Sequence, residues 1–149
     1  MARLVTLMAL GIAIALAPTL TEAKSKRIHV TAQIVQQTFT GDDMAKPKLG
    51  DQLISSVKLL DKHNDEVGTG AGVCTIVRVP PLETQLQCLL TVEFAKGQII
   101  FGGVAPLPVP EVVATFAILG GTDDFRKARG EATLTVISDK LQEAVFDIE

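Results

Sequence analysis

The feature that most constrains this chain is a succession of short apolar-polar alternations separated by turn-forming residues. The clearest run is 85–94, whose apolar face consists of Leu86, Cys88, Leu90, Val92 and Phe94. Alternation with a period of two predicts a β-strand with one buried face. Seven further runs alternate or are rich in β-branched residues: 27–38, 53–61, 67–79, 98–101, 112–119, 131–137 and 141–148. Because no window after residue 23 combines a helical period with caps, the chain is predicted to be all-β.

Eight short strands at hairpin spacing in one small domain favour either a sandwich or an up-and-down barrel. A closed barrel of eight strands is just wide enough to hold one small ligand. The segment Pro106–Pro110 is predicted to be a loop, since alternate prolines disrupt both helices and sheets.

The first 23 residues are typical of a secretory signal peptide. Arg3 precedes an uncharged, largely apolar run of 14 residues from Leu4 to Ala17, and Thr21-Glu22-Ala23 offers small residues at a cleavage site. An uncleaved anchor is the alternative, although the run is shorter than the roughly 20 residues of a membrane-spanning helix. We therefore expect residues 24–149 to form a single secreted domain without a stable membrane span.

Composition excludes several function classes. The chain of 149 residues has 14 Lys and Arg against 17 Asp and Glu, a net charge of −3, which argues against nucleic acid as a partner. Two Cys and two His are too few for a closed four-ligand zinc site, so we expect neither a metal nor a cofactor. His29 and His63 are expected at the surface, and no G-x-S-x-G nucleophile motif occurs.

Three glycines, Gly68, Gly70 and Gly72, stand at alternate positions at the start of one predicted strand. They do not match a dinucleotide-binding fingerprint, which has the spacing G-x-G-x-x-G and opens a helix. A bulge or a kink of a barrel strand explains them better.

The two cysteines, Cys74 and Cys88, are symmetric about residue 81 in the Pro80-Pro81-Leu82 turn. If 67–94 is a hairpin, they lie directly opposite each other, at a separation close to the lower limit for a disulfide. The alternative is a pair of reduced, buried cysteines. An oxidising compartment favours the disulfide.

The segment 120–130, GGTDDFRKARG, is the densest motif in the chain. From the residues alone it is a strand that ends in a Gly-Gly turn, followed by a charged connection. Asp123, Asp124, Arg126 and Arg129 could pair there as a small surface network.

This segment resembles the GGTG-x-[FY]-R-x-ARG stretch of dirigent proteins and of their bacterial relatives in the allene oxide cyclase barrel superfamily. The residues that match are Gly120, Gly121, Thr122, Phe125, Arg126, Ala128, Arg129 and Gly130, to which we assign a structural role. Gly50-Asp51 and 67–74 resemble the GD…VG-x-x-AG-x-C pattern of allene oxide cyclases, and 94–103 is similar to a strand–glycine–strand hairpin of the family. The resemblance spans about residues 50–137.

The resemblance implies an eight-stranded antiparallel β-barrel with an apolar interior, assembled as trimers or dimers. Dirigent proteins bind and steer reactive radicals made elsewhere, whereas allene oxide cyclases close a ring in a fatty-acid epoxide. Two positions depart from the family. Asp123 replaces the usual glycine, and the first strand has Gln33, Gln36 and Gln37 but no acid, which argues against plant-type cyclase chemistry.

We therefore expect a secreted barrel that binds and orients a small hydrophobic molecule, without redox chemistry of its own. The alternatives are an isomerase or cyclase acting on a lipid-like or polyketide-like substrate, and a structural or interaction barrel with a solid core. Residues on one face point the same way, so Glu93 should point outward, as should Leu89, which would suit an interface between subunits. The predicted cavity wall is Ile76, Leu86, Leu90, Val92 and Phe94, and the inward residues of the first strand are Ile28, Val30, Ala32 and Ile34.

Overall fold

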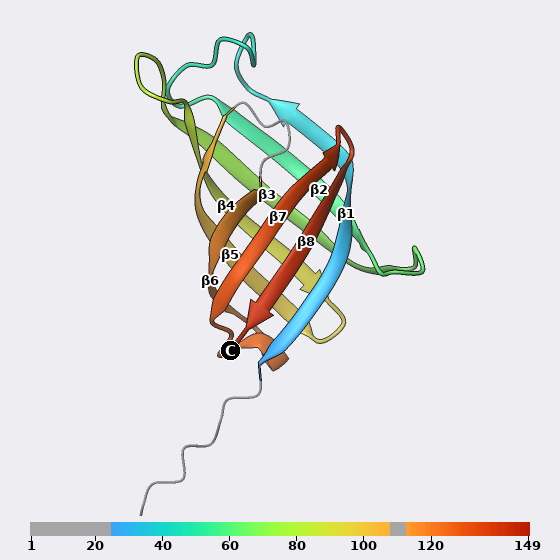
Figure 1. The fold of residues 1–149 in the computed structure, drawn as a ribbon. Coiled ribbons are helices and arrows are strands. Elements are labelled where there is room, and N and C mark those ends of the chain that lie inside the picture. Colours follow the sequence, from blue (N-terminus) through green and yellow to red (C-terminus); the bar gives the residue numbers. More distant parts are fainter. Residues whose placement is uncertain (1–24, 108–112) are drawn as a thin grey trace, which may run out of the picture.

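The computed structural model describes residues 25–107 and 113–149, in which eight antiparallel strands close into a barrel (Figure 1). Each strand pairs with the next in sequence, and β8 pairs with β1. The strands are β1 (Lys26–Phe39), β2 (Gln52–Leu60), β3 (Glu66–Arg78), β4 (Gln85–Phe94), β5 (Gly97–Pro106), β6 (Val113–Gly121), β7 (Gly130–Ser138) and β8 (Leu141–Ile148). The predicted all-β barrel is confirmed, and the sandwich is excluded. The proposed leader, residues 1–23, lies outside the described residues.

Two boundaries differ from the sequence-based prediction by more than one residue. Strand β5 runs to Pro106, five residues beyond its predicted end, because Gly102 and Gly103 interrupt the apolar alternation without interrupting the pairing with β4. Gly120 and Gly121 are the last residues of β6 rather than a turn, and the chain turns only at Thr122. The one helical element in the described residues is the single turn η1 (Asp123–Phe125).

Five irregularities in the pairing each leave one extra residue on a strand. All five extra residues are apolar and point to solvent: Val35, Val67, Val77, Leu119 and Ile137. An extra residue in one strand bends it and increases its twist, which is how a sheet coils into a barrel. These bulges therefore explain a large share of the exposed aliphatic side chains. They also reverse the inward-outward alternation of every residue that follows on the strand.

The three alternate glycines of β3 point into the barrel, where they permit a close approach of β4. A Cβ on Gly68 would collide with the carbonyl oxygen of Glu93, and a Cβ on Gly72 would collide with the side chain of Leu90. Their role is therefore architectural, as the sequence indicated, and the bulge at Val67 lies next to them.

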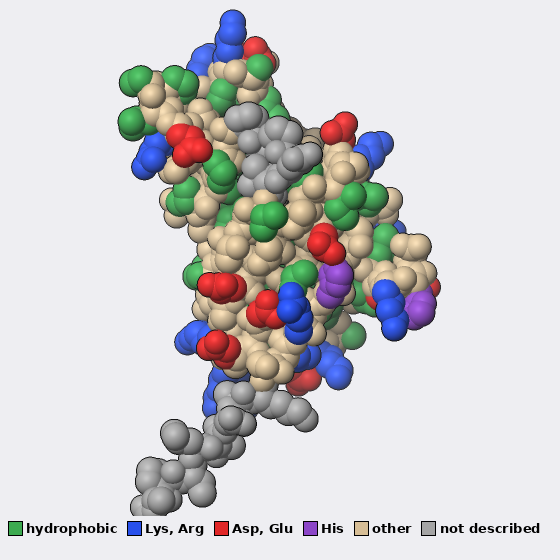
Figure 2. All heavy atoms as spheres, in the orientation of Figure 1, with side chains coloured by type: hydrophobic (Ala, Val, Ile, Leu, Met, Phe, Trp, Pro, Cys, Tyr) green, Lys and Arg blue, Asp and Glu red, His purple; other side chains and the backbone are tan. Residues whose placement is uncertain are grey.

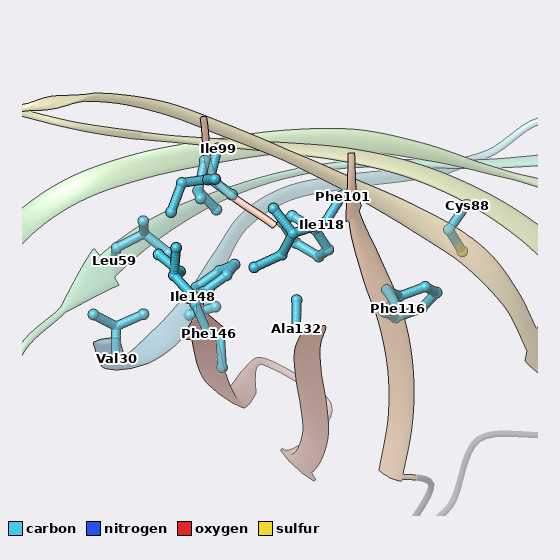
Figure 3. Close-up of a cluster of buried hydrophobic side chains, with 14 of the residues drawn as sticks. Val30, Leu59, Cys88, Ile99, Phe101, Phe116, Ile118, Ala132, Phe146 and Ile148 are labelled. Carbon is cyan, nitrogen blue, oxygen red and sulfur yellow. The ribbon is translucent and has the colours of Figure 1, made fainter. Parts of the chain in front are cut away.

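Figure 3 shows part of the hydrophobic core. Most of its large side chains lie in the half of the barrel nearest the C-terminus, although it also includes Ile76 and Leu86 towards the other end. Phe101 lies at its centre, with its ring centroid 5.2 Å from that of Phe146 and 6.1 Å from that of Phe116, both edge-on. Ile99, Leu59 and Phe146 are fully buried. This packing leaves no room for a ligand in that half.

The GGTDDFRKARG motif closes this same end of the barrel. Thr122 is tied to β5 by two hydrogen bonds with Gln98, and η1 places Phe125 inward, 6.0 Å from the ring of Phe94. Lys26 Nζ lies 4.7 Å from the centroid of the Phe125 ring. Ala128 is also buried. The motif is thus a structural plug.

Two details of the plug bear on the sequence analysis. Asp123 has φ +50°, a left-handed conformation that favours glycine, which accounts for the glycine usual at this position in the resembled families. The predicted surface network of Asp123, Asp124, Arg126 and Arg129 was wrong: among the described residues these side chains form no ion pair with one another. Arg129 instead donates to the carbonyl oxygen of Ala128.

Charged side chains gather on the outer face of β7, β8 and β1 (Figure 2). There Arg27 pairs with Asp147, and His29 Nε2 lies 2.7 Å from Glu143 Oε1. His63 is exposed in the turn between β2 and β3, so both histidines lie at the surface as expected. Among the described helices, none has the length and apolar character needed to cross a membrane.

Candidate functional site

A cavity of about 670 Å³ opens at the end of the barrel opposite the plug. It lies where β1, β3, β5 and β7 end and is bordered by the loops 40–51 and 79–84 (Figure 1). We call it the mouth cavity. Its lining residues are Ile34, Gln37, Met44, Ala45, Pro47, Leu53, Thr84, Leu86, Leu107, Val136, Ser138, Asp139 and Gln142. Functional pockets for small molecules have volumes of about 300–1,000 Å³, so the mouth cavity has the size of a ligand site.

The walls of the mouth cavity differ in polarity. Apart from Thr84, the side formed by β2, β4 and the loops is apolar: Leu86 is buried, Leu53, Leu107 and Pro47 are half-buried, and Met44 is exposed. The opposite side, formed by β7, β8 and β1, adds four polar residues to the aliphatic Ile34 and Val136. These polar residues are Gln37, Ser138, Asp139 and Gln142.

Below the mouth cavity is a much smaller void of about 50 Å³ in the middle of the barrel. Its wall includes Gly72, Leu90, Val92, Ala144 and Phe146, and Gln142 borders both spaces. A void of this size holds a water molecule or two and no organic ligand.

The structure separates the five residues predicted as the cavity wall. All five point into the barrel, but only Leu86 lines the mouth cavity. Leu90 and Val92 line the small void, while Ile76 and Phe94 pack in the core. Their role in ligand binding stays a prediction. The inward positions of Ile28, Val30 and Ala32 and the outward position of Glu93 agree with the alternation.

The described part of the barrel interior contains no buried charged or polar side chain. Among the described residues, Asp139 is the one ionisable residue that lines the mouth cavity, and it lies at the rim in the turn between β7 and β8. Three other carboxylates at the mouth have partners in the loop 40–51. Asp42 pairs with Lys48, Asp43 accepts a hydrogen bond from the backbone of Ala45, and Asp51 accepts one from the backbone of Lys48.

At the plugged end of the barrel, Asp61 closes the turn between β2 and β3. The backbone N–H groups of Asp65 and His63 donate to this carboxylate and hold its pKa below the ordinary value. Asp61 lies in that turn, away from the mouth cavity. Its lowered pKa is therefore a feature of the turn and not of the candidate site.

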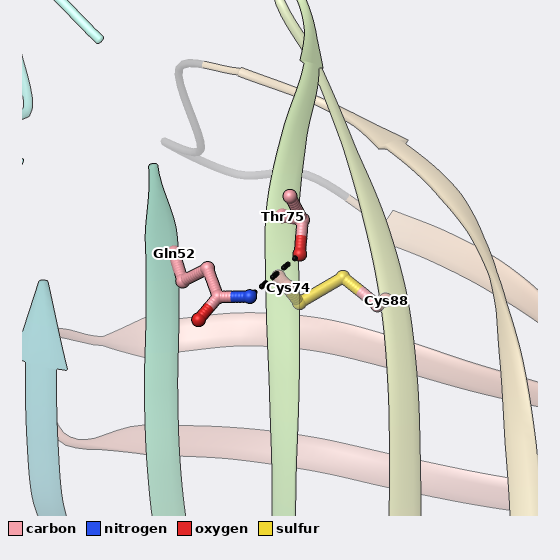
Figure 4. Close-up of a disulfide and its surroundings, with 4 residues drawn as sticks. All are labelled: Gln52, Cys74, Thr75 and Cys88. Atoms are coloured by element: carbon pink, nitrogen blue, oxygen red, sulfur yellow. Dashed lines mark hydrogen bonds between the residues drawn. A yellow bond between two sulfur atoms is a disulfide. The ribbon is translucent and has the colours of Figure 1, made fainter. Parts of the chain in front are cut away.

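Cys74 and Cys88 form a disulfide between β3 and β4, as predicted (Figure 4). They are direct partners in the antiparallel register, with Cα atoms 4.0 Å apart. On the outer face beside them, Gln52 Nε2 donates to Thr75 Oγ1 at 3.4 Å, which links β2 to β3. The disulfide therefore lies in the inner wall, one inward position from Leu86.

Four polar residues of the mouth cavity were missed by the sequence analysis. Gln37 faces inward because the bulge at Val35 reverses the alternation of β1. Ser138 lies two positions beyond the inward Val136 on β7, so the alternation of that strand could have found it. Gln142 could have been found by counting back in steps of two along β8 from Phe146 and Ala144. Asp139 lies in a turn, where no periodicity predicts direction.

A closed antiparallel barrel with one end plugged and a cavity at the other defines a class of barrels that can hold small molecules. The sequence matches the family described as allene oxide cyclase barrel like domain over residues 28–147. The chain therefore belongs to this family. A search of curated protein sequences finds no match.

Three solved structures share the fold at low sequence identity. A pyocyanin demethylase has a TM-score of 0.74 and 22% identity, covering 83% of this chain and 100% of its own. The exo-specific intermolecular Diels-Alderase AbnU has a TM-score of 0.72 and 16% identity, covering 85% and 98%. The Diels-Alderase AbmU from Streptomyces koyangensis has a TM-score of 0.68 and 13% identity, covering 83% and 63%. At these identities the likeness shows the fold alone.

Proposed function

We propose that this barrel binds a small, largely apolar molecule in the mouth cavity and holds it in one orientation. The observation that carries the proposal is a cavity of about 670 Å³ whose deep wall is aliphatic and whose polar groups are confined to one side and the rim. Such a division lets the apolar wall provide affinity while a few polar groups fix the orientation. In this function the protein acts as a dirigent protein does, binding without redox chemistry of its own.

A second candidate is a cyclase that closes a ring by orientation alone. Holding reacting atoms in a near-attack geometry can lower a barrier substantially without any acid or base. The printed names of two similar structures, both Diels-Alderases, favour this candidate as much as the first. Both candidates require the same occupied cavity. Turnover of a bound diene–dienophile pair would favour the cyclase, and binding without turnover the steering role.

Binding can be tested with N-phenyl-1-naphthylamine, a neutral dye that fluoresces in apolar surroundings. Because the chain contains neither Trp nor Tyr, protein emission does not obscure the signal. We expect about one dye per barrel, and Leu86→Glu should weaken binding by at least about tenfold, since a carboxylate in the apolar wall must be desolvated when the dye enters.

The matched control for this experiment is Leu49→Glu, whose side chain is 65% exposed and does not line the cavity. It should bind the dye as the wild type does. Ala45→Trp, which fills the rim without burying a charge, should weaken binding even if Leu86→Glu fails to fold. Equal binding by the wild type and a folded Ala45→Trp variant would contradict the proposal.

We also propose that copies of the chain associate through the outer face of β4, β5 and β6. The outward residues of this face are uncharged in three stretches, which are 87–91 of β4, 100–104 of β5 and 113–117 of β6. Leu89 is 53% exposed and Leu119 is 56% exposed, and a hollow over Gly102 and Gly103 lies between them. A second copy can insert its own Leu89 into this hollow.

Sedimentation equilibrium tests this association. The chain without residues 1–23 should have a dimeric or trimeric mass at micromolar concentration. Leu89→Glu should shift it to the monomer, because a carboxylate would be buried in the contact, while Leu49→Glu should not. A monomeric wild type would contradict the association.

Secretion remains part of the proposal. It is supported by the signal-like residues 1–23 and by the disulfide, since disulfides persist mainly outside the reducing cytoplasm. Edman sequencing of the exported protein should then begin at Lys24.

A further inference from the structure

We propose that the mouth cavity selects its ligand by charge, and that Asp139 is the residue that does so. The ligand would be a neutral or cationic amphiphile whose polar end donates a hydrogen bond at the β7–β8 rim, with its apolar body against the β2–β4 wall. This inference rests on the proposed function and names the class of molecule that the cavity accepts.

The first step concerns how the polar side of the cavity is built. From the plug towards the mouth, the inward residues of β8 are Ile148, Phe146, Ala144 and Gln142. The first three are apolar, and the polar Gln142 is the one that reaches the cavity. The bulge at Val35 brings Gln37 to the same side, and Ser138 at the end of β7 lines it two positions beyond Val136. Strand pairing makes β1, β8 and β7 neighbours, so these groups are on adjacent strands rather than scattered around the rim. A ligand would therefore find its polar contacts along one side of the cavity.

The second step concerns charge. Amide and hydroxyl groups both donate and accept hydrogen bonds, whereas an ionised carboxylate only accepts. Among the described lining residues, Asp139 is the one carboxylate, and none is Lys, Arg or His. Three lysines lie in the described loops at this end: Lys48, whose Nζ lies 2.8 Å from Asp42 Oδ2, and the exposed Lys46 and Lys140. An anionic ligand would therefore meet a like charge with no lining cation to offset it.

The third step is the balance of the whole rim. The described loops at this end contain five acids, Asp42, Asp43, Asp51, Glu83 and Asp139, and three bases, Lys46, Lys48 and Lys140. With Arg78, the exposed last residue of β3 at this end, the described rim has four bases and a net charge of −1. The electrostatic potential at the entrance is thus negative, as is the charge of Asp139 in the lining. This favours the approach of neutral or cationic molecules over anionic ones.

The test compares two dyes with the same anilinonaphthalene body. N-phenyl-1-naphthylamine is neutral, and 1-anilinonaphthalene-8-sulfonate has one negative charge. The wild type should bind the neutral dye more tightly than the sulfonate. Asp139→Asn should reduce this preference by about three- to tenfold, mainly by tightening sulfonate binding, since unit charges a few ångströms apart at an exposed, water-screened site interact with about this strength.

A second series separates charge from shape. Decylamine, decan-1-ol and decanoate share one chain and differ in the head group, and each is used to displace the neutral dye at pH 7. In the wild type we expect decylamine to displace the dye at the lowest concentration and decanoate at the highest. In Asp139→Asn the difference between amine and carboxylate should narrow, and the alcohol should change least.

The control variant is Asp124→Asn, which removes the same charge from the exposed plug at the other end of the barrel. It should behave as the wild type in both series. If the wild type binds the neutral dye but Asp139→Asn and Asp124→Asn show the same preference as the wild type, charge selection by Asp139 is overturned and the proposed function stands. If no dye or amphiphile binds the wild type, the proposed function fails as well.

Discussion

Replacing Phe146 with alanine is expected to lower the free energy of unfolding by about 3–5 kcal/mol. This side chain is 0% exposed and lies where the core rings converge, with its ring centroid 5.2 Å from that of Phe101 and 6.3 Å from that of Phe94. Side chains from facing strands of the barrel pack around Phe146, and the closed barrel holds these strands apart. The backbone therefore cannot collapse into the space that the substitution leaves. Urea denaturation followed by far-ultraviolet circular dichroism measures the loss.

The matched control is Leu49→Ala, whose side chain is largely exposed, and it should change stability by less than about 0.5 kcal/mol. A loss below about 1 kcal/mol for Phe146→Ala would mean that the plugged half of the barrel is not close-packed. The described core, and the confinement of the ligand site to the other end, would then both be wrong.

Removing the disulfide by the double substitution Cys74→Ala and Cys88→Ala should cost about 3 kcal/mol. The bond joins residues separated by 14 positions, so it closes a short loop of the unfolded chain and lowers its conformational entropy. The folded barrel keeps its pairing between β3 and β4, because nine further residue pairs hold that register. Stability should therefore fall while the circular dichroism spectrum stays that of a β-barrel.

Dithiothreitol provides the internal control for this experiment. It should destabilise the wild type to about the level of the double variant and should not affect the variant itself. Peptide mapping without reductant should find the two cysteines joined in the exported protein. Free thiols in that material would contradict the disulfide, and unequal effects of reductant and substitution would mean that the alanines also disturb the packing.

The alternation of single strands predicted much of this fold. The run from Leu86 to Phe94 gave the inward face of β4, and the symmetry of the two cysteines about residue 81 gave the register of β3 with β4. These inferences succeeded because the pairing between Gly68 and Ile76 on β3 and their partners on β4 is regular. Parity and register follow from spacing wherever the pairing is uninterrupted.

Part of the polar side of the candidate site could not be predicted in the same way. A bulge adds one residue to a strand without a distinctive sequence signal, and it reverses the direction of every side chain after it. Gln37 was therefore not assigned to the interior, although Ile34 just before the bulge was. The bulge residues Val35 and Ile137 are apolar, so composition also favoured an inward position for the wrong residues.

The family motif and the cavity lie at opposite ends of the barrel. Residues 120–130 are the most distinctive stretch of the sequence, and the structure uses them to plug one end through Phe125 and Ala128. The residues that line the cavity come from loops and strand ends with no shared pattern, such as Thr84 and Asp139. A resemblance carried by the plug thus identifies the fold far better than the ligand.

The central claim is that a small molecule occupies the open end of the barrel. Nuclear magnetic resonance of the ¹⁵N-labelled protein titrated with N-phenyl-1-naphthylamine tests it directly. We predict that the backbone amides of Leu86, Val136 and Gln142 shift with saturation at about one dye per barrel, while those of Phe125 and Ala128 at the plugged end do not. Shifts confined to the outer face around Leu89 and Leu119, or no saturable shifts at all, would contradict the claim.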